Sequence, residues 1–496
     1  MMLLHIALKA TLEYNEDTKV AHYMYSVVKF HIKENRYPKL FEYCTEMSAK
    51  SKRLRNAALF RIRQWYTAYG KDQVQRNQQD VIDEVLLTMK LSGREKPGIV
   101  IPYGFLERLM RITKNPDYFN GLPSQTAQWV LKNAVNDFFN WLAAMDAYDA
   151  DPSKFTGKPK MPKYCKKDLH TFTITNQECR IKSRNDGTQF LHFPKTTETI
   201  DVTVPENGIL KEVKVIPWHG DFLITVTLEY EKSVRERNAM FMAGIDLGVN
   251  NTAAIVINDG GKPVLYKGGA LKAGNQFYNK NRAKYTGILM KGHKPGEVSL
   301  NTKKLASISK NRSFFINDQL HKISSHIVNV CVKRNVGTIV IGKNTYWKTN
   351  SKMSKKSNQE FVQIPHSTLV WMIRYKAERE GITVIEQEES YTSKASFLDN
   401  DMIPIYDPEN YEEHKFSGKR ISRGLYRSKN GIVISADVNG GANILRKAYP
   451  EAFEGMDVSF LQEVETVGFY DLNPCRPKKK DCSVNKSIPV KRIAGV

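Results

Sequence analysis

Acidic side chains at the ends of expected strands and helices are the residues of this chain best suited to chemistry. Asp246 ends a buried strand in "GIDLGVNN", and Asp437 begins a helix in "SADVNGGANI". Glu386, Glu388 and Glu389 end the β-branched run "TVIEQEE". A carboxylate is costly to bury unpaired, and open α/β sheets bind ligands at the ends of their strands. The pattern indicates a ligand site at a sheet edge. The alternatives are a turn-capping Asp246, an N-cap Asp437 and glutamates at a solvated strand end.

The elements that must position these acids follow from the hydrophobic pattern of the C-terminal half. Apolar runs predict three consecutive strands, then a helix near 300–335, and then alternating strands and helices. The expected strands are 242–248, 252–259, 263–269, 338–342 and 383–389, with helices at 367–381 and from about Asp437. A meander followed by alternating helix and strand is typical of a mixed sheet with helices on its faces. The two glycines of "NGGAN" would let another backbone approach that last helix closely.

The N-terminal half has a different texture. Residues 45–145 carry apolar residues at helical spacing, with Ser124 as the expected N-cap of one helix. A Pro-, Gly- and Lys-rich linker follows at 151–168. Alternating runs from 168 to 233 predict a small antiparallel β-barrel, completed by an N-terminal strand in "HIALKATLEY". The basic tail "NPCRPKKKDCSVNKSIPVKRIAGV" is expected to be disordered.

Charge and composition narrow the class of partner. The chain has 496 residues, 75 Lys plus Arg against 52 Asp plus Glu, and a net charge of +23, which indicates a polyanion such as nucleic acid. The basic residues are spread along the chain, which disfavours a membrane surface, and no apolar run is long enough to span a bilayer. The six cysteines form no C-x-x-C pair and fit reduced thiols of a cytoplasmic protein.

Several of these segments together resemble a known family. The succession "GIDLGVNNTAAIVI", "IVIGKN", "YKAEREGITVIEQEESYTSKASFLD" and "ADVNGGANI" is similar to TnpB, the transposon-encoded RNA-guided nuclease related to type V CRISPR effectors. The resemblance implies a multidomain α+β protein whose nuclease domain is RuvC-like, of RNase H fold. The implied domains are a β-barrel wedge in two parts (1–40 and 151–237, the latter with the linker), a helical recognition domain (41–150), the nuclease domain (238–472, with an insertion at 392–434) and the tail (473–496).

The resemblance also implies the chemistry of the acids. A RuvC site holds two Mg²⁺ ions about 4 Å apart between carboxylates, and Asp246 and Asp437 match the first and last acids of its triad. The middle acid, usually in an "EDL"-like stretch, is missing, because this chain has Gly342, Lys343 and Asn344 there. Either the nuclease is dead, or the acid has moved to the end of the neighbouring strand. We favour relocation, with Glu389 ahead of Glu388.

A second departure concerns zinc. The four cysteine positions of the family's zinc ribbon are occupied here by Ala395, Leu398, Arg427 and Asn430, so no structural zinc is expected. A small apolar core must then hold the insertion; its expected members are Phe397, Leu398, Ile403, Tyr406, Leu425 and Tyr426. Three arginines would remain to contact nucleic acid or local acids: Arg420, Arg423 and Arg427.

The implied partners are a guide RNA from the mobile element and double-stranded target DNA, bound by a monomer with one RNA. Base pairing would supply specificity, and the protein would read a short motif beside the target. Candidate nucleic-acid contacts are Lys52, Arg53, Ser124, Gln125, Gln128, Thr175 and Asn176. Gln and Asn can bond adenine in the major groove, although helix capping and turn formation also explain such residues. Two rival hypotheses are a nuclease-dead repressor and a DNA-joining transposase, the latter disfavoured because no separate transposase motif is present.

Overall fold

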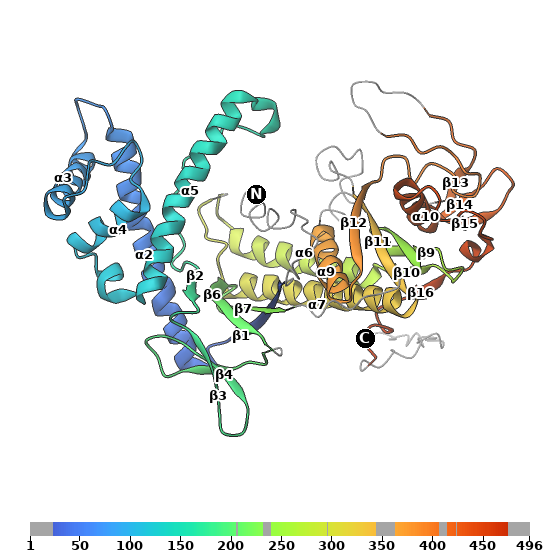
Figure 1. Cartoon of the computed structure of the whole chain (residues 1–496), viewed down its shortest axis with the longest axis horizontal. Coiled ribbons are helices and arrows are strands. Elements are labelled where there is room, and N and C mark those ends of the chain that lie inside the picture. Colours follow the sequence, from blue (N-terminus) through green and yellow to red (C-terminus); the bar gives the residue numbers. More distant parts are fainter. Residues whose placement is uncertain are drawn as a thin grey trace, which may run out of the picture. The chain divides into compact units, whose positions relative to one another are not determined.

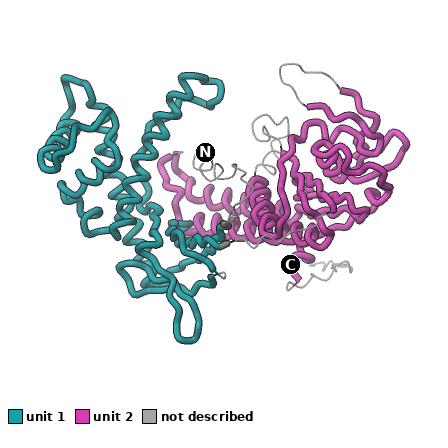
Figure 2. Tube along the Cα trace, viewed as in Figure 1, with its two compact units in different colours: residues 1–233 teal, residues 234–496 magenta. Residues whose placement is uncertain are grey.

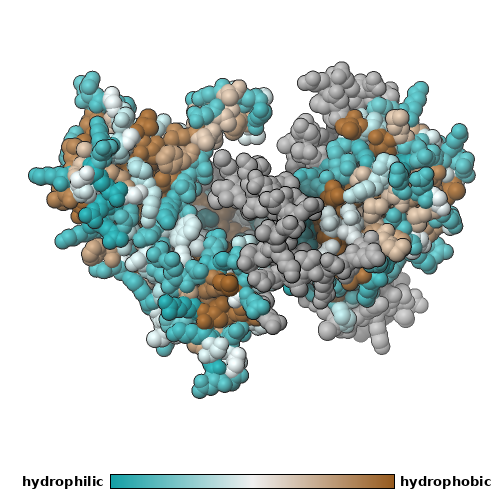
Figure 3. All heavy atoms as spheres, viewed as in Figure 1, coloured by the Kyte–Doolittle hydropathy of each residue, from teal (hydrophilic) through white to brown (hydrophobic). Residues whose placement is uncertain are grey.

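The protein is described here from a computed structural model. It describes residues 23–204, 207–231, 240–294, 296–343, 363–405, 414–422 and 424–474. The expected strand at 5–14 and the tail from 475 lie outside these residues. The chain divides into two compact units, residues 1–233 and 234–496 (Figure 2). Within the described part, no helix is long and apolar enough to cross a membrane. The face seen in Figure 3 is mostly hydrophilic, with smaller hydrophobic clusters.

The first unit contains the expected helices. They are α2 (Pro38–Ala68), α3 (Arg76–Ser92), α4 (Tyr103–Ile112) and α5 (Ser124–Ala150), with short turns η1 (Asp117–Gly121) and η2 (Pro152–Lys154). The prediction that Ser124 caps α5 is wrong, because Pro123 is the N-cap residue and Ser124 already belongs to the helix. The carboxylate of Glu178 accepts hydrogen bonds from the Gln125 and Thr126 amides instead, at 2.7 and 3.0 Å. A distant acid thus satisfies the free N–H groups of this helix start.

The strands of the first unit form two antiparallel sheets. One has the order β1 (Tyr23–Ile32), β7 (Asp221–Glu231), β6 (Ile209–Trp218) and β2 (Phe172–Thr175). The other has the order β3 (Arg180–Ser183), β4 (Gln189–His192) and β5 (Thr199–Asp201). Helices and strands share one hydrophobic core, with Leu54 and Ile62 from α2 and Val213 and Val226 from the sheet. The helical and β segments therefore fold as one unit.

The second unit is built on a six-stranded mixed sheet (Figure 1). Its order is β12 (Thr383–Glu388), β11 (Val336–Lys343), β8 (Phe241–Asp246), β9 (Asn251–Ile257), β10 (Val264–Lys267) and β16 (Glu465–Val467). The meander β8–β9–β10 is antiparallel, whereas β11 runs parallel to β8 and β12 parallel to β11. The mixed α+β class and the five expected strands are confirmed.

Helices cover both faces of this sheet, which explains why β9 is buried almost throughout. On one face, α7 (Lys303–Lys333) and α9 (His366–Arg379) pack against Ile245, Ile255 and Ile341. On the other, α10 (Ala436–Ala448) packs against Val256 and Val340. Three features were not predicted from the sequence: α6 (Gly269–Met290), β16 and the small sheet of β13 (Lys419–Ser422), β14 (Leu425–Arg427) and β15 (Val433–Ser435).

The expected core of the insertion is only partly present. Phe397 and Tyr426 are buried and Leu398 is half-buried, but Leu425 is 44% exposed. The reason is the alternation of β14, in which Tyr426 faces inward and its neighbours face outward. Ile403 is half-buried, and Tyr406 lies outside the described residues.

Candidate active site

Asp246 ends β8 on the face of the sheet that α10 covers. Two glycines of α10 make this close packing possible: a Cβ at Gly440 would stand 2.8 Å from Asp246 Oδ2. Gly244 precedes Asp246 by two residues and lies on the same face of β8. A Cβ at Gly244 would stand 2.2 Å from the carbonyl oxygen of Gly441. The prediction that these glycines admit another backbone is confirmed. The helix therefore lies directly against the strand that carries Asp246.

Asp437 lies in the first turn of α10, after the N-cap residue Ser435. It is not the cap residue; its Oδ2 accepts a hydrogen bond of 2.7 Å from the Asn251 side chain at the start of β9. Arg420 approaches the other oxygen, with Nη2 3.9 Å from Oδ1. The helix N-terminus and these two side chains all favour a negative charge at this position.

The amide-rich first turn of α10 has a role that the sequence did not reveal. Buried Asn439 donates to the Ala395 carbonyl at 2.8 Å and accepts from the Phe397 amide at 3.0 Å. Buried Asn443 donates to the carbonyls of Thr392 and Ala395 at 2.9 and 2.8 Å. Both asparagines thus fix the segment after β12 against the helix that carries Asp437.

The three glutamates of the "EQEE" run have separate surroundings. Glu386 forms ion pairs with Lys343 and with Arg374 of α9. Glu388 accepts from Lys447 Nζ at 2.7 Å and from the Ser390 amide at 2.6 Å. Burial by itself would raise the pKa of Glu388, but these bonds outweigh it and lower the pKa. Glu386 and Glu388 are therefore held by basic partners.

Glu389 lies in a different place, over the strand position where the family's middle acid is missing. Gly342 of β11 pairs in register with Gln387 of β12, so Glu389, two residues further on, belongs to the same face. The Oε2 atom of Glu389 is buried and would be 2.6 Å from a Cβ at Gly342. Its carboxylate thus fills the space that a side chain at Gly342 would need.

The pKa of Asp246 depends on the charges of the other two carboxylates. Burial raises the pKa of Asp246 well above its ordinary value, and the negative charges of Asp437 and then Glu389 raise it further. Glu388 has no part in this effect. Such mutual repulsion is what a bound cation relieves, and oxygen donors suit Mg²⁺.

The residues fit Mg²⁺ by the type of their donor atoms and not by the positions of those atoms. Among the described residues, no three Asp, Glu, His or Cys side chains are arranged around one ion position. Magnesium commonly takes one or two carboxylates together with waters and substrate phosphates, so the three carboxylates need not all surround one ion. The all-carboxylate donor set fits that ion.

Two family profiles match the chain over this site. The OrfB_IS605 family, described as probable transposase, matches residues 225–348, and a Cas12f1-like TNB domain matches residues 366–444. The chain is 27% identical over 210 residues to the TnpB-like protein ORF457 of Acidianus two-tailed virus, covering 42% of each chain. It is 24% identical over 230 residues to the TnpB-like protein MJ0751 of Methanocaldococcus jannaschii, covering 43% of this chain and 78% of that one. The chain is thus similar to TnpB-like proteins, and it spans less than half the length of the first of them. The matched profiles include Asp246, Glu389 and Asp437.

Two solved complexes align with this chain over most of its length. A Cas12f1–sgRNA–target DNA complex aligns with a TM-score of 0.49 at 12% identity, covering 83% of this chain and 84% of that one. An AacC2c1–sgRNA–extended non-target DNA complex aligns with a TM-score of 0.37 at 8% identity, covering 86% and 70%.

The candidate readers of a target-adjacent motif lie close together in the first unit. Glu178, in the turn after β2, bonds the start of α5, and its own amide donates to the Thr175 carbonyl at 3.1 Å. The helix start with Ser124, Gln125 and Gln128 therefore adjoins the strand end with Thr175 and Asn176. Their contact with DNA stays a prediction.

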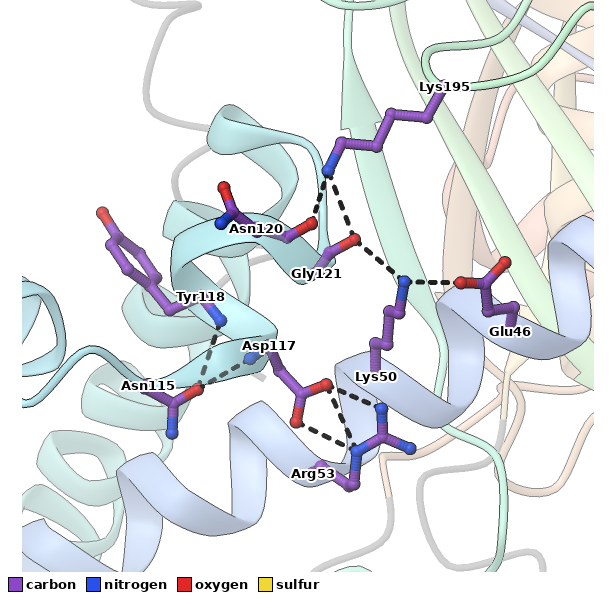
Figure 4. A network of polar contacts seen from close by, with 9 residues as sticks. All are labelled: Glu46, Lys50, Arg53, Asn115, Asp117, Tyr118, Asn120, Gly121 and Lys195. Carbon is purple, nitrogen blue, oxygen red and sulfur yellow. Dashed lines mark hydrogen bonds and ion pairs between the residues drawn. The ribbon is translucent and has the colours of Figure 1, made fainter.

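Arg53 has a partner inside the protein. Its guanidinium donates to both carboxylate oxygens of buried Asp117 in η1, at 2.7 to 3.2 Å (Figure 4). Lys50 Nζ and Lys195 Nζ also donate to backbone carbonyls at the end of that turn. Lys52 Nζ is 3.9 Å from Asp168. Arg53 thus stabilises this turn of the helical segment. Its contact with nucleic acid stays a prediction.

The structure describes two of the three arginines of the insertion. Arg420 is exposed and faces Asp437, so it belongs to the site. Arg427 is exposed on β14, and Arg423 lies outside the described residues. Of the family's four zinc positions, Ala395 is buried and its carbonyl bonds the α10 asparagines. Hydrogen bonds and apolar packing therefore hold this segment against α10.

Proposed function

We propose that this protein is a Mg²⁺-dependent, RNA-guided DNA endonuclease encoded by a mobile element. The observation that carries the proposal is the position of Glu389. Its carboxylate lies over Gly342, on the sheet face of Asp246 and beside the helix that carries Asp437. A chain whose catalytic site had decayed would have no reason to keep a third carboxylate at the point where the family's acid is missing.

The sheet supports assignment of a RuvC-like nuclease domain of RNase H fold. An antiparallel meander extended by two parallel strands on its first strand gives the order β12–β11–β8–β9–β10. This order brings the ends of β8, β11 and β12 to one edge, where the acids lie. In the first unit, the two antiparallel sheets are the parts from which a wedge barrel would be built.

The side chains have separable roles in this proposal. Asp246, Glu389 and Asp437 would hold two Mg²⁺ ions, which when bound activate a water and stabilise the leaving oxygen of a phosphodiester. Asn251 fixes the Asp437 carboxylate through its 2.7 Å hydrogen bond. Arg420, exposed and 3.9 Å from Asp437, is placed to bind a phosphate next to the acids. Asn439 and Asn443 hold the segment after Glu389 in place.

The charge of the chain supports guide RNA and target DNA as partners. With a net charge of +23, the protein can follow the phosphates of a heteroduplex while base pairing selects the target. The motif beside the target would be read by the start of α5 and the end of β2. We propose a monomer bound to one RNA.

The test is cleavage of a target plasmid by the purified protein–RNA complex in Mg²⁺, with Asp246→Ala as the blank. Mg²⁺-dependent product above that blank is expected. Retained, guide-dependent DNA binding without such product would instead assign the nuclease-dead repressor. Loss of both would reject RNA guidance altogether.

A further inference from the structure

The second unit has a groove that the nuclease site does not use. It lies between α6 and α7 and has a volume of about 650 Å³. Aromatic rings of Phe277, Tyr278 and Tyr285 line it, and Phe315 forms its inner wall against Phe469, with ring centroids 6.3 Å apart. A Cβ at Gly274 would stand 2.6 Å from the Phe315 ring, so the glycine allows the two helices to approach. The groove is thus a defined feature of the α6–α7 pair.

These aromatic rings are not explained by core packing. Of the 22 residues of α6, only Leu271 and Asn275 are buried. Phe277, at the edge of the groove, is 73% exposed. One exposed and two half-buried aromatic side chains, Phe277, Tyr278 and Tyr285, on a helix that buries so little indicate a binding surface.

Positive charge surrounds the groove. Residues 269–317 contain ten Lys and Arg and one acid, Glu297. Lys304 Nζ lies 5.0 Å from the Tyr285 ring centroid, and the Arg312 guanidinium 5.0 Å from that of Tyr278. Arg312 also donates to two neutral acceptors, the Asn275 side chain and the Gln363 carbonyl, at 2.7 and 3.0 Å. These partners orient the guanidinium but do not neutralise its charge.

The hollow continues beyond the groove. A second cavity of about 500 Å³ shares Tyr278 and Arg312 with it and extends to Arg282. The two cavities therefore bring several aromatic and cationic side chains to one continuous hollow.

We propose that the α6–α7 groove binds unpaired nucleotides, with bases stacked on Phe277 and Tyr285 and phosphates paired with Lys304 and Arg312. Alternating stacking platforms and cations are how proteins hold single strands. Charge argues against a second copy of the chain, because it would bring the same cations, Arg282, Lys304 and Arg312, to the contact. The inference rests on the proposed function only for the source of the strand, which is either an unpaired part of the guide RNA or a displaced DNA strand.

The experiment uses the full-length protein with Asp246→Ala in EDTA, so nuclease activity is not involved. The probes are oligouridine and oligothymidine of about 12 nucleotides, containing 4-thiouridine or 4-thiothymidine, and an abasic oligonucleotide of equal length and charge. We expect photo-crosslinks in peptides from 269–317 and a clear preference for the base-containing probes over the abasic one. The better of the RNA and DNA probes identifies the source of the strand.

Substitutions make the result specific. Phe277→Ala and Tyr285→Ala should each weaken the base-containing probe about 5- to 100-fold, from the stacking contribution of one base, without affecting the abasic probe. Lys304→Gln should flatten the salt dependence of binding by about one phosphate contact. Trp371→Ala, which removes a 56% exposed ring of α9, is the matched control and should change nothing.

Equal binding of abasic and base-containing probes would overturn the proposal, as would crosslinks confined to other peptides. Light scattering of the free protein tests the other occupant: a dimer that Phe277→Ala converts to monomer would assign the groove to a second copy. Because no divalent metal is present, failure here leaves the nuclease proposal standing. Conversely, absence of cleavage in the plasmid test leaves the groove proposal standing.

Discussion

Glu388→Gln and Glu389→Gln should change the protein in opposite ways although the residues are adjacent. Glu388 is bonded to the ammonium of Lys447, whose side chain is only 7% exposed. Glu389 instead adds a like charge beside Asp246. In metal-free buffer, neutralising Glu388 therefore removes an attraction, whereas neutralising Glu389 removes a repulsion.

The structure sets the size of each effect. Glu388→Gln leaves buried Lys447 with two carbonyl acceptors, those of Ser390 and Pro404. A hydrogen bond to a charged group is worth about 1.5–3 kcal/mol, so the melting temperature of the second unit should fall by roughly 3–8 °C. Glu389→Gln should leave metal-free stability unchanged or raise it by up to about 1 kcal/mol. It should lower the cleavage rate about 100-fold or more, equivalent to about 2.7 kcal/mol.

The assay is thermal unfolding of the full chain with and without Mg²⁺, alongside plasmid cleavage by the RNA complex. An ion at ten times its dissociation constant adds about 1.4 kcal/mol to the wild type, and Glu389→Gln should lose most of that gain. Glu388→Gln should keep it and cut within a few-fold of wild type at a temperature where it is folded. If Glu388→Gln abolishes cutting while Glu389→Gln does not, the assignment of the third carboxylate is wrong.

Three further substitutions test the ion pair of a buried aspartate, a close contact between β8 and α10, and a half-buried lysine. Arg53→Ala leaves buried Asp117 without its bidentate partner and should cost about 1.5–3 kcal/mol in urea unfolding; weakened RNA binding with an unchanged midpoint would instead assign Arg53 to nucleic acid. Gly244→Ala places a Cβ 2.2 Å from a carbonyl oxygen of α10 and should cost about 3 kcal/mol or more, whereas Gly269→Ala, with no atom within 4 Å, should be tolerated. Burial lowers the pKa of Lys376 to about 8 from 10.5, so the folded state disfavours its ammonium form. Wild-type stability should therefore rise relative to Lys376→Met as pH increases from about 8 towards 10, and a constant difference in melting temperature would contradict this.

The sequence predicted five of the six strands of the second unit's sheet because most of them are short apolar runs, such as β9 and β11, that are largely buried. The same pattern placed Asp246 at a strand end and Asp437 at a helix start. It missed α6 because that helix buries only two residues and so has no apolar stripe to detect. It assigned the cap of α5 to Ser124 because no local pattern shows that Glu178, 52 positions along the chain from Thr126, takes this role.

The choice between Glu388 and Glu389 was open in the sequence because both lie at the end of the expected strand 383–389. The register between β11 and β12 decides which face each belongs to, and that register depends on contacts between segments about 45 residues apart. Once Gly342 is known to pair with Gln387, the alternation of the strand places Glu389 on the α10 face. The partners also differ: Glu386 pairs with Arg374 of α9 and Glu388 with Lys447 near the C-terminal end of α10, whereas the charge of Glu389 acts on Asp246.

The absent acid at position 342 and the acid present at 389 are linked by one steric fact. A Cβ at Gly342 would stand 2.6 Å both from Glu389 Oε2 and from the Ile444 side chain. The space can therefore hold a side chain from β11 or the carboxylate from beyond β12, but not both. A glycine at 342 is thus a requirement for a carboxylate arriving from position 389, and by itself it is no sign of a decayed site. A decayed site would be expected to lose acids independently, whereas under the proposed relocation the glycine at 342 leaves the space that the Glu389 carboxylate fills.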